Sequence, residues 1–379
     1  MKILHIHQDY PDGRPFPHTK AVHHLIKAAQ QQDASTMHFV LSVNRTSNPF
    51  KVSFKTFKQG VSIVYWAIPL PFLYAPSLFF WAWLIARKLK RCEFTAVHGH
   101  KLTSEGVLAY RLSKAWKVPY LVSVRGGSDL HNIGRLADCK KLFSKVYQQA
   151  AFVFWVSPWA KASVEQKLGV ERVDKQARFA NICQIDPQLK DLPVERNQYL
   201  TVLSFHQYQR KGIMPLIEAI SELKQAGTQI ELNVCGSGND SVKQQLIELI
   251  QSLNLENQVK LLGQLPHDQL LQLMKKSKGF LLPAKNETFG MAYIEALSCG
   301  CPILYHQNTG VDGFFDAFPL GVKVSEQSIG ELFVALRQLE VQYPLYKANV
   351  QKLINQGYLK EFTADYAANH YLTHLKQVV

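Results

Sequence analysis

The sequence lacks the cysteine patterns that build disulfide frameworks or metal centres. Its six cysteines are scattered, with no C-x-x-C pair and no cluster formed with histidines. This distribution indicates reduced cysteines in the core of a cytosolic protein rather than a disulfide-bonded secreted domain. The cysteines are Cys92, Cys139, Cys183, Cys235, Cys299 and Cys301.

Long apolar runs are also lacking. The opening MKILHIHQDY has an apolar run too short for a signal peptide and predicts a strand, so secretion is not expected. The most apolar segment, residues 66–91, contains three prolines, and its helix-compatible stretch 77–90 has about ten apolar residues where a spanning helix needs about twenty. This stretch is either a core helix with a basic C-terminal end, or a helix lying on an anionic membrane with Trp81 and Trp83 at the interface. The basic end consists of Arg87, Lys88, Lys90 and Arg91.

Negative charge is scarce, with 29 Asp and Glu against 43 Lys and Arg and a formal net charge of +14. Such a balance attracts polyanions, among them nucleic acid, anionic lipid and phosphorylated substrates. No recognisable DNA or RNA module accompanies the charge, so nucleic acid is not an expected partner. The sequence also has no G-x-x-x-x-G-K-[ST], which argues against a P-loop NTPase.

What the sequence does have is an alternation of short β-rich runs with amphipathic helical patterns. KILHIH, HFVLSV, TAVHGH, YLVSV and FVFWVS precede the polar stretch 184–198, and YLTVLSF, IELNVCG, VKLLG, GFLLPA and CPILYH follow it. This alternation predicts an α/β fold of two doubly wound domains, which we expect to face each other across a cleft. The expected ranges are 1–190, 197–360 and a C-terminal helix at 361–379.

The segment PAKNETFGMAYIEALSCGCP, residues 283–302, places two carboxylates near one helix start. Glu287 lies in the expected loop after the strand GFLLP, Gly290 opens the helix, and Glu295 lies about one turn inside it. The unpaired amides of a helix N-terminus bind phosphate, and carboxylates accept hydrogen bonds from sugar hydroxyls. Singly, each glutamate also fits a structural role, Glu287 near the helix dipole and Glu295 on a half-buried helix face. Together they favour a nucleotide-sugar site.

Two further loops follow strands in the second half. Arg210 and Lys211 precede Gly212 at an expected helix start, a combination that suits a diphosphate but also fits a solvated basic turn. Gly236 and Gly238 in CGSGND form either a tight strand-to-helix turn or a backbone contact with a ligand.

The first half has its own polar residues at strand ends. His98 and His100 follow one strand, and Arg125 and Asp129 follow another. Two histidines at this spacing can share a metal, but no third ligand with a convincing sequence spacing accompanies them, so a hydrogen-bonding or structural role is favoured and no metal is expected. The loop 9–22, which contains Gly13, either closes over a ligand or is a long turn.

These residues resemble glycosyltransferase family 4, the retaining glycosyltransferases of the GT-B fold. The two glutamates seven residues apart, with their Phe-Gly and Ala-Leu-x-x-Gly-x-Pro context, resemble the family motif most closely, and looser similarities run over nearly the whole chain. The resemblance implies that Glu295 holds the donor ribose, while Glu287 and the backbone of Phe289, Gly290 and Met291 hold the donor sugar.

The resemblance also assigns roles elsewhere. Arg210 and Lys211 would neutralise the diphosphate in place of a metal, and His98, Arg125 and Asp129 would lie near the transfer site on the acceptor side, with His100 and Gly13. The chain departs from the family at Phe205-His206, where many members have Gly-Arg, and at Gly13-Arg14-Pro15, where many have paired glycines. The segment HQNTGVDGFF also lacks the usual glutamate, and Asp312 is its nearest acid.

The expected activity is retaining, metal-independent transfer of a hexose-type sugar without a cofactor, from a nucleotide-diphosphate sugar. The expected acceptor is a hydroxyl of a saccharide or lipid-linked saccharide. Bacterial capsule, lipopolysaccharide or exopolysaccharide synthesis is the expected setting, with the protein cytoplasmic or peripheral at an anionic membrane face. A non-catalytic nucleotide-sugar-binding protein and a nucleotide-sugar epimerase or hydrolase remain alternatives.

Overall fold

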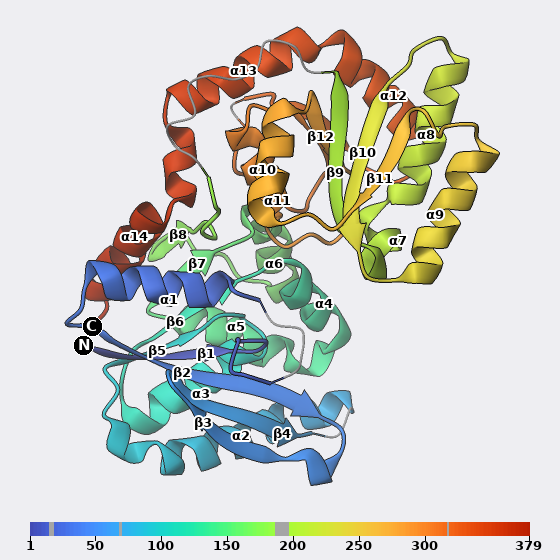
Figure 1. The fold of residues 1–379 in the computed structure, drawn as a ribbon. Helices are drawn as coiled ribbons and strands as arrows, with labels where there is room; N and C mark the ends of the chain where they lie inside the picture. Colours follow the sequence, from blue (N-terminus) through green and yellow to red (C-terminus); the bar gives the residue numbers. More distant parts are fainter. Residues whose placement is uncertain (15–18, 68–69, 186–196, 317) are drawn as a thin grey trace. The chain divides into compact units, whose positions relative to one another are not determined.

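The computed structural model describes residues 1–14, 19–67, 70–185, 197–316 and 318–379, which form two compact units (Figure 1). Unit 1 comprises Met1–Ile182 together with Thr363–Val379, and unit 2 comprises Cys183–Phe362. The expected domain boundary at residue 190 and most of the expected linker 184–198 lie outside the described residues.

Unit 1 is built on an eight-stranded sheet in the order β3-β4-β2-β1-β5-β6-β7-β8. All neighbouring strands are parallel except β3, which pairs antiparallel with β4 at the edge. The central strands β5, β6 and β7 are buried on both faces, as the largely apolar sequences of β6 and β7 require. The strands are β1 Lys2–His7, β2 Met37–Thr46, β3 Ser53–Phe57, β4 Gly60–Trp66, β5 Ala96–Gly99, β6 Tyr120–Val124, β7 Phe152–Trp155 and β8 Gln176–Arg178.

Helices cover both faces of this sheet, and the last helix of the chain packs on the first (Figure 1). They are α1 Ala21–Gln32, α2 Tyr74–Lys88, α3 Glu105–Trp116, α4 Gly127–Arg135, α5 Lys140–Gln149, α6 Lys161–Leu168 and α14 Ala364–Lys376. Short 3-10 turns are η1 Pro49–Lys51, η2 Pro71–Leu73, η3 Lys90–Cys92, η4 Ala137–Cys139 and η5 Pro158–Ala160. The Thr363 side chain accepts from the Tyr366 amide and starts α14.

The apolar segment of unit 1 forms α2, which begins at Tyr74, three residues before the expected helix start at Ser77. One face of α2 packs into the core through Leu78, Trp81, Ala82 and Ile85. Trp81 is therefore buried, as the core-helix alternative requires, and the alternative that places it at a membrane interface is wrong for this residue. No helix in the described ranges has the length and hydropathy to cross a bilayer.

Unit 2 is a six-stranded parallel sheet in the order β11-β10-β9-β12-β13-β14. Its strands are β9 Gln198–Ser204, β10 Glu231–Ser237, β11 Val259–Gly263, β12 Gly279–Leu282, β13 Ile303–His306 and β14 Gly321–Val324. Its helices are η6 Phe205–Gln207, α7 Tyr208–Lys211, α8 Ile213–Gln225, α9 Asp240–Ser252, α10 His267–Lys276, α11 Met291–Ser298, α12 Ile329–Val341, α13 Tyr343–Asn355 and η7 Tyr358–Phe362.

Each sheet has a topological switch point, the place where successive strands begin to be added on the other side. In unit 1 it lies between β1 and β5, and in unit 2 between β9 and β12. Ligands of open α/β sheets bind outside the carboxyl ends of the strands at such points. The loops after β9 and β12 are therefore the first place to look for a site in unit 2.

Candidate functional site

Three of the predicted site residues meet at the switch point of unit 2. The Lys211 Nζ lies 2.5 Å from Glu287 Oε2, and the nearest guanidinium nitrogen of Arg210 lies 3.6 Å from the same oxygen. Arg210 and Lys211 follow β9, whereas Glu287 lies in the loop after β12. The sequence separates these side chains by more than seventy residues, and the adjacent parallel strands bring them together.

The local structure around Arg210 and Lys211 differs from the prediction. Both residues belong to the one-turn helix α7 and do not lie in a loop. Gly212, at φ +70°, ends this helix, and its amide donates to the carbonyl oxygens of Tyr208 and Gln209. The Gly212 amide is therefore already used and is not a donor for a ligand.

The loop that carries Glu287 is held in place by its backbone. The Glu287 carbonyl oxygen accepts from the Gly310 amide at 2.7 Å and from the Thr309 hydroxyl at 2.7 Å. Arg210 donates to the carbonyl of Asn286 at 3.0 Å. Gly310 and Thr309 both stand in the segment HQNTGVDGFF, but no local pattern gave either residue a role. These bonds fix the carboxylate of Glu287 relative to the two cations.

Gly290 directly precedes α11, as expected, but the structure gives a different reason for glycine there. Its φ is +73°, and a Cβ atom would come within 2.4 Å of the Tyr293 ring. The buried Phe289 ring packs against Phe314 at 5.3 Å, so only the backbone of Phe289 is available to a ligand. Met291, the first residue of the helix, is 43% exposed.

Glu295 is buried, with 8% of its surface exposed. Burial raises the pKa of its carboxyl group, and the opposing influence is the charge of His267. The His267 Nε2 lies 3.8 Å from Glu295 Oε1 and has no hydrogen-bond partner within the described part of the chain. The sequence analysis did not identify His267, which starts α10, and its place just after a proline was the one available signal.

The two glycines of CGSGND have structural explanations. Gly236 lies within β10, where a Cβ would come within 2.2 Å of the Leu203 carbonyl oxygen on the neighbouring strand. Gly238 has φ +129°, and a Cβ would come within 2.7 Å of the His206 ring. Gly236 nevertheless borders a cavity of about 280 Å³ at the carboxyl ends of β9 and β10. This cavity is lined by Val202, Leu203, Ser204, Cys235, Gly236, Ser237, Gln264, Leu265 and Leu270.

In unit 1 the predicted histidines are interior residues. His98 is fully buried, with Nε2 2.9 Å from the Ser123 hydroxyl and Nδ1 3.3 Å from the Tyr371 hydroxyl. His100 is buried as well, with Nε2 3.0 Å from His5 Nδ1. This placement favours the structural role that the sequence analysis left open, and contact with an acceptor stays a prediction.

The structure brings a third histidine to these two, which the sequence spacing did not show. His5 on β1 joins His98 and His100, and each offers a nitrogen within 4.8 Å of the others. The signal was lost because β1 and β5 are neighbours in space but far apart in sequence. Both nitrogens of His5 are already in hydrogen bonds, to His100 and, at 2.8 Å, to His38. A chain of neutral rings therefore accounts for the cluster.

Arg125 and Asp129 are also engaged within unit 1. Asp129, fully buried, accepts from the amides of Leu102, Thr103 and Arg125 at 2.9–3.0 Å. Burial raises the pKa of its carboxyl group, and these donors oppose the increase. The Arg125 Nε donates to the His100 carbonyl at 2.9 Å. Asp129 thus connects the start of α4 to the loop before α3 through hydrogen bonds. The prediction that Asp129 lies near the sugar acceptor did not include this structural role.

The loop after β1 is described up to Arg14. Gly13 has φ +85° and open space where a Cβ would stand. The Arg14 guanidinium pairs with Asp12 and donates to the Ser42 hydroxyl at 2.7 Å. Pro15 and the following residues to 18 lie outside the described residues, and the role of Gly13 toward a ligand stays a prediction.

Comparison with known proteins connects this geometry to a family. Residues 186–356 match the family model for glycosyl transferases group 1. The chain is 30% identical over 122 residues to the gpi3 subunit of phosphatidylinositol N-acetylglucosaminyltransferase of Schizosaccharomyces pombe, covering 32% of this chain and 26% of that one. It is 27% identical over 203 residues to the amylovoran biosynthesis glycosyltransferase AmsK of Erwinia amylovora, covering 50% and 47%. The chain thus spans less than half the length of these two relatives.

The structure of Anabaena HepE in complex with UDP is similar to the whole chain. Its TM-score is 0.69 at 15% identity, with 100% of each chain covered. The two doubly wound units therefore define a GT-B fold, as predicted. Residues 186–356, which contain Arg210, Lys211, Glu287 and Glu295, match the model of the glycosyl transferases group 1 family, and this match is consistent with the resemblance to glycosyltransferase family 4.

Proposed function

We propose that this chain is a retaining glycosyltransferase that moves a hexose-type sugar from a nucleotide-diphosphate sugar to a hydroxyl of a saccharide or lipid-linked saccharide. The observation that supports it most is the meeting of Glu287 with Lys211 and Arg210 at the switch point of unit 2. AmsK, whose name places it in amylovoran biosynthesis, supports a setting in bacterial surface polysaccharide synthesis. A cytoplasmic location is part of the proposal.

The cations suit the charge of the donor. In the proposed complex, Arg210 and Lys211 face the diphosphate, because a guanidinium fork and an ammonium group both bind phosphate oxygens. The first amides of α11 add donors at the positive end of the helix dipole. Glu287 then accepts from sugar hydroxyls, and Glu295 accepts from the ribose. The cavity at the ends of β9 and β10 offers room for the nucleoside.

The transfer step follows from this arrangement. The bond between the anomeric carbon and the diphosphate oxygen breaks, and the departing diphosphate takes the electron pair. The acceptor hydroxyl forms the new bond on the same face of the sugar, and its proton passes to the departing phosphate. Fixed cations stabilise the developing negative charge and so lower the barrier, without a metal in this proposal.

The test is transfer from a panel of UDP-, GDP- and ADP-sugars to lipid-linked and free saccharides, with and without EDTA. We expect one donor to release its nucleotide diphosphate, and the product to keep the donor's anomeric configuration by proton NMR. A matched control is Lys243→Ala, which removes an exposed lysine of α9 and leaves the site intact. A product with the inverted anomeric configuration would overturn the proposed retention. Loss of transfer in the presence of EDTA would overturn the proposed metal independence.

One observation favours a non-catalytic nucleotide-sugar-binding protein. Arg14 stands where many family members have the second of two glycines, and its guanidinium is tied to Asp12 and Ser42. A loop held in this way has less freedom to close on a phosphate. This alternative would be supported if the chain bound a nucleotide sugar but released no nucleotide diphosphate with any acceptor. Hydrolysis or epimerisation of the nucleotide sugar without an acceptor would instead support a nucleotide-sugar hydrolase or epimerase.

A further inference from the structure

Unit 1 exposes aromatic side chains on one connected surface formed by α2 and the edge strands β3 and β4. We call Phe54, Trp66, Phe80 and Trp83 the aromatic surface. Their exposed fractions are 37%, 38%, 55% and 50%. Single exposed apolar residues are common on proteins, but a connected group of large rings indicates an interaction site.

Ring contacts show that these residues are neighbours. The Phe80 ring is stacked on Trp83 at 6.2 Å, and both Phe80 and Phe54 contact the buried Trp81, at 5.8 and 6.0 Å. Trp81 donates from its indole to the Trp66 carbonyl at 2.9 Å. The buried Trp81 therefore joins the helix part and the strand part of the aromatic surface.

The outward face of α2 is apolar along much of its length. Pro76, Phe80, Trp83 and Arg87 are exposed and recur at the three- and four-residue spacing of one helix face. The opposite face fills the core through Leu78 and Ile85. The helix is thus apolar on its exposed face as well as on its buried face, which core packing alone does not require.

The chain segment that forms this surface carries charge of one sign. No Asp or Glu stands between Asp33 and Glu93 in the sequence. The Arg87 guanidinium lies over the Trp83 ring at 4.4 Å, and the Lys88 ammonium lies over the Phe54 ring at 4.1 Å. Cations placed beside exposed aromatic rings match a bilayer interface, where phosphates lie next to the acyl chains.

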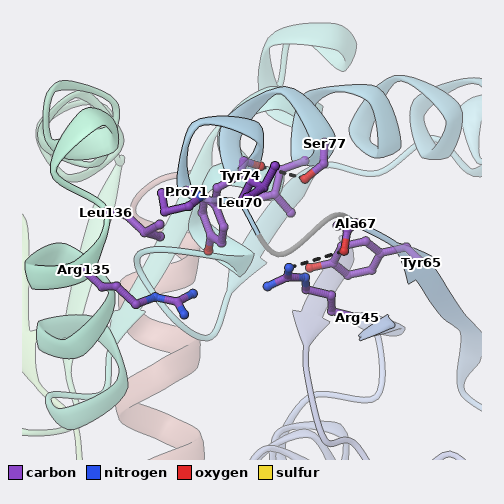
Figure 2. Close-up of a pocket in the computed structure, with 10 residues that line it drawn as sticks. Arg45, Tyr65, Ala67, Leu70, Pro71, Tyr74, Ser77, Arg135 and Leu136 are labelled. Carbon is purple, nitrogen blue, oxygen red and sulfur yellow. Dashed lines mark hydrogen bonds between the residues drawn. The ribbon is translucent and has the colours of Figure 1, made fainter. Parts of the chain in front are cut away.

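A pocket at the N-terminal end of α2 adds two more cations. Figure 2 shows the side chains of Arg45 and Arg135 pointing into it from opposite sides. Leu70, Pro71 and Tyr74 line the same pocket. Arg45 donates to the Ala67 carbonyl at 3.3 Å, whereas Arg135 forms no hydrogen bond or ion pair with the described residues. No acidic side chain lines the pocket in the described part of the chain.

We propose that the aromatic surface docks unit 1 onto a bilayer that contains anionic phospholipid. Phe80 and Trp83 enter the boundary between head groups and acyl chains, while Arg87 and Lys88 contact lipid phosphates. The α2 helix then lies in the plane of the membrane. This inference does not depend on sugar transfer, because its residues belong to unit 1 and the proposed donor site belongs to unit 2.

The experiment is co-sedimentation of the full chain with vesicles of phosphatidylcholine alone and of phosphatidylcholine with 30 mol% phosphatidylglycerol. We expect binding to the anionic vesicles and at least tenfold weaker binding to the neutral ones. Phe80→Ala/Trp83→Ala should weaken binding at least tenfold. Arg87→Gln/Lys88→Gln should weaken anionic binding by about fivefold for each cation removed, with a smaller effect on neutral vesicles.

Matched controls separate this surface from general charge and hydrophobicity. Tyr366→Ala removes a half-exposed ring of α14 in the same unit, and Lys243→Gln/Lys260→Gln removes two exposed cations of unit 2. Both should bind as the unmodified chain does, and circular dichroism should show the same melting temperature for all variants. Equal binding to both vesicle types, no binding, or binding unaffected by Phe80→Ala/Trp83→Ala would each overturn the proposal. A dimer that these two substitutions dissociate would assign the surface to a second copy.

Discussion

The two units share a doubly wound design but fill their switch points in opposite ways. In unit 1 the strands β1 and β5 bring His5, His98 and His100 together, and the three rings are almost completely shielded from water. In unit 2 the loops after β9 and β12 bring Glu287 to Arg210 and Lys211, which keep 17%, 32% and 12% of their side chains exposed.

The difference lies in where the polar groups find partners. In unit 1 the buried carboxylate of Asp129 is satisfied internally, by three backbone amides. Unit 2 pairs charges with one another at the surface, where a charged ligand can replace or join a partner. Buried groups of the first kind stabilise the fold, whereas groups of the second kind remain available for binding. Substitutions of these residues in unit 1 should therefore lower stability, whereas substitutions in unit 2 should lower activity.

The largest expected effect is on activity in unit 2. Lys211→Ala should lower kcat by about 100- to 1,000-fold, because one fixed donor aimed at developing charge is typically worth that much. Its melting temperature should change little, since Arg210 stays near Glu287. Steady-state rates with the identified donor, together with calorimetry, check both parts. If Lys211→Ala failed to fold, or kept an unchanged rate, the proposed contrast between stabilising residues in unit 1 and functional residues in unit 2 would be wrong.

The counterpart in unit 1 is Asp129→Ala, for which we expect a loss of about 3 kcal/mol in the free energy of unfolding. The substitution leaves several buried amide donors without an acceptor, and each such group costs about 1–3 kcal/mol before the structure relaxes. Urea unfolding measures the change. Asp138→Asn, at an exposed acid of η4, is the control and should be neutral. A stable Asp129→Ala variant with abolished transfer would restore the predicted acceptor role.

A pH series should show the same contrast at a smaller scale. Burial lowers the pKa of His38 to about 4 and of His98 to about 3, from 6.5. Below pH 6.5 the unfolded chain binds more protons than the folded one, so unit 1 should lose stability as the pH falls toward these values. Each such histidine contributes about 1.4 kcal/mol per pH unit.

Hydrogen exchange followed by mass spectrometry at pH 7, 6 and 5 resolves this loss by unit. Amides of β1 and β5 should lose protection relative to those of β9 and β12, after correction for the intrinsic pH dependence of exchange. His98→Gln should reduce the pH slope even though it lowers stability at pH 7, whereas His206→Gln, at an exposed histidine of unit 2, should not. An unchanged slope in His98→Gln would show that folding does not lower the pKa of His98.

Much of the fold was predictable because its signals are local. Largely apolar runs such as YLVSV and FVFW are buried strands, and the amphipathic sequences at residues 19–32 and 103–116 form α1 and α3. The strand β3 was not predicted, since its sequence SFKTF lies on the sheet edge and is mostly exposed. An edge strand does not need the apolar sequence that a central strand has.

The candidate site was predictable where residues follow strands and unpredictable where they depend on burial. Glu287, Arg210 and Lys211 come together because β9 and β12 are neighbours, which the rule for switch points anticipates. The same rule placed Arg125 and Asp129 near a ligand, yet both are buried. Sequence position shows which end of a sheet a residue occupies, but not whether neighbouring loops cover it. His267 was missed because its partner Glu295 lies on another helix.

The smallest expected effect on stability is at Glu295, the one buried carboxylate of the candidate site with a raised pKa. Desolvation penalises its charged form in the folded protein, so Glu295→Gln should leave the melting temperature at pH 7 unchanged or slightly raised. Nucleotide affinity should nevertheless fall about tenfold, since a charged acceptor of hydrogen bonds is typically worth about 1.5–3 kcal/mol. Calorimetric titration of the identified nucleotide diphosphate measures this loss.

The pH dependence of binding sharpens the same test. If the ribose needs the carboxylate, affinity of the unmodified chain should weaken as the pH falls through the raised pKa of Glu295, while Glu295→Gln should show a flatter profile over the same range. Glu248→Gln, at α9, is the matched control and should bind as the unmodified chain does. A variant that binds nucleotide normally and melts at a lower temperature would make Glu295 a structural residue like Asp129, and the two switch points would then differ less than their exposure indicates.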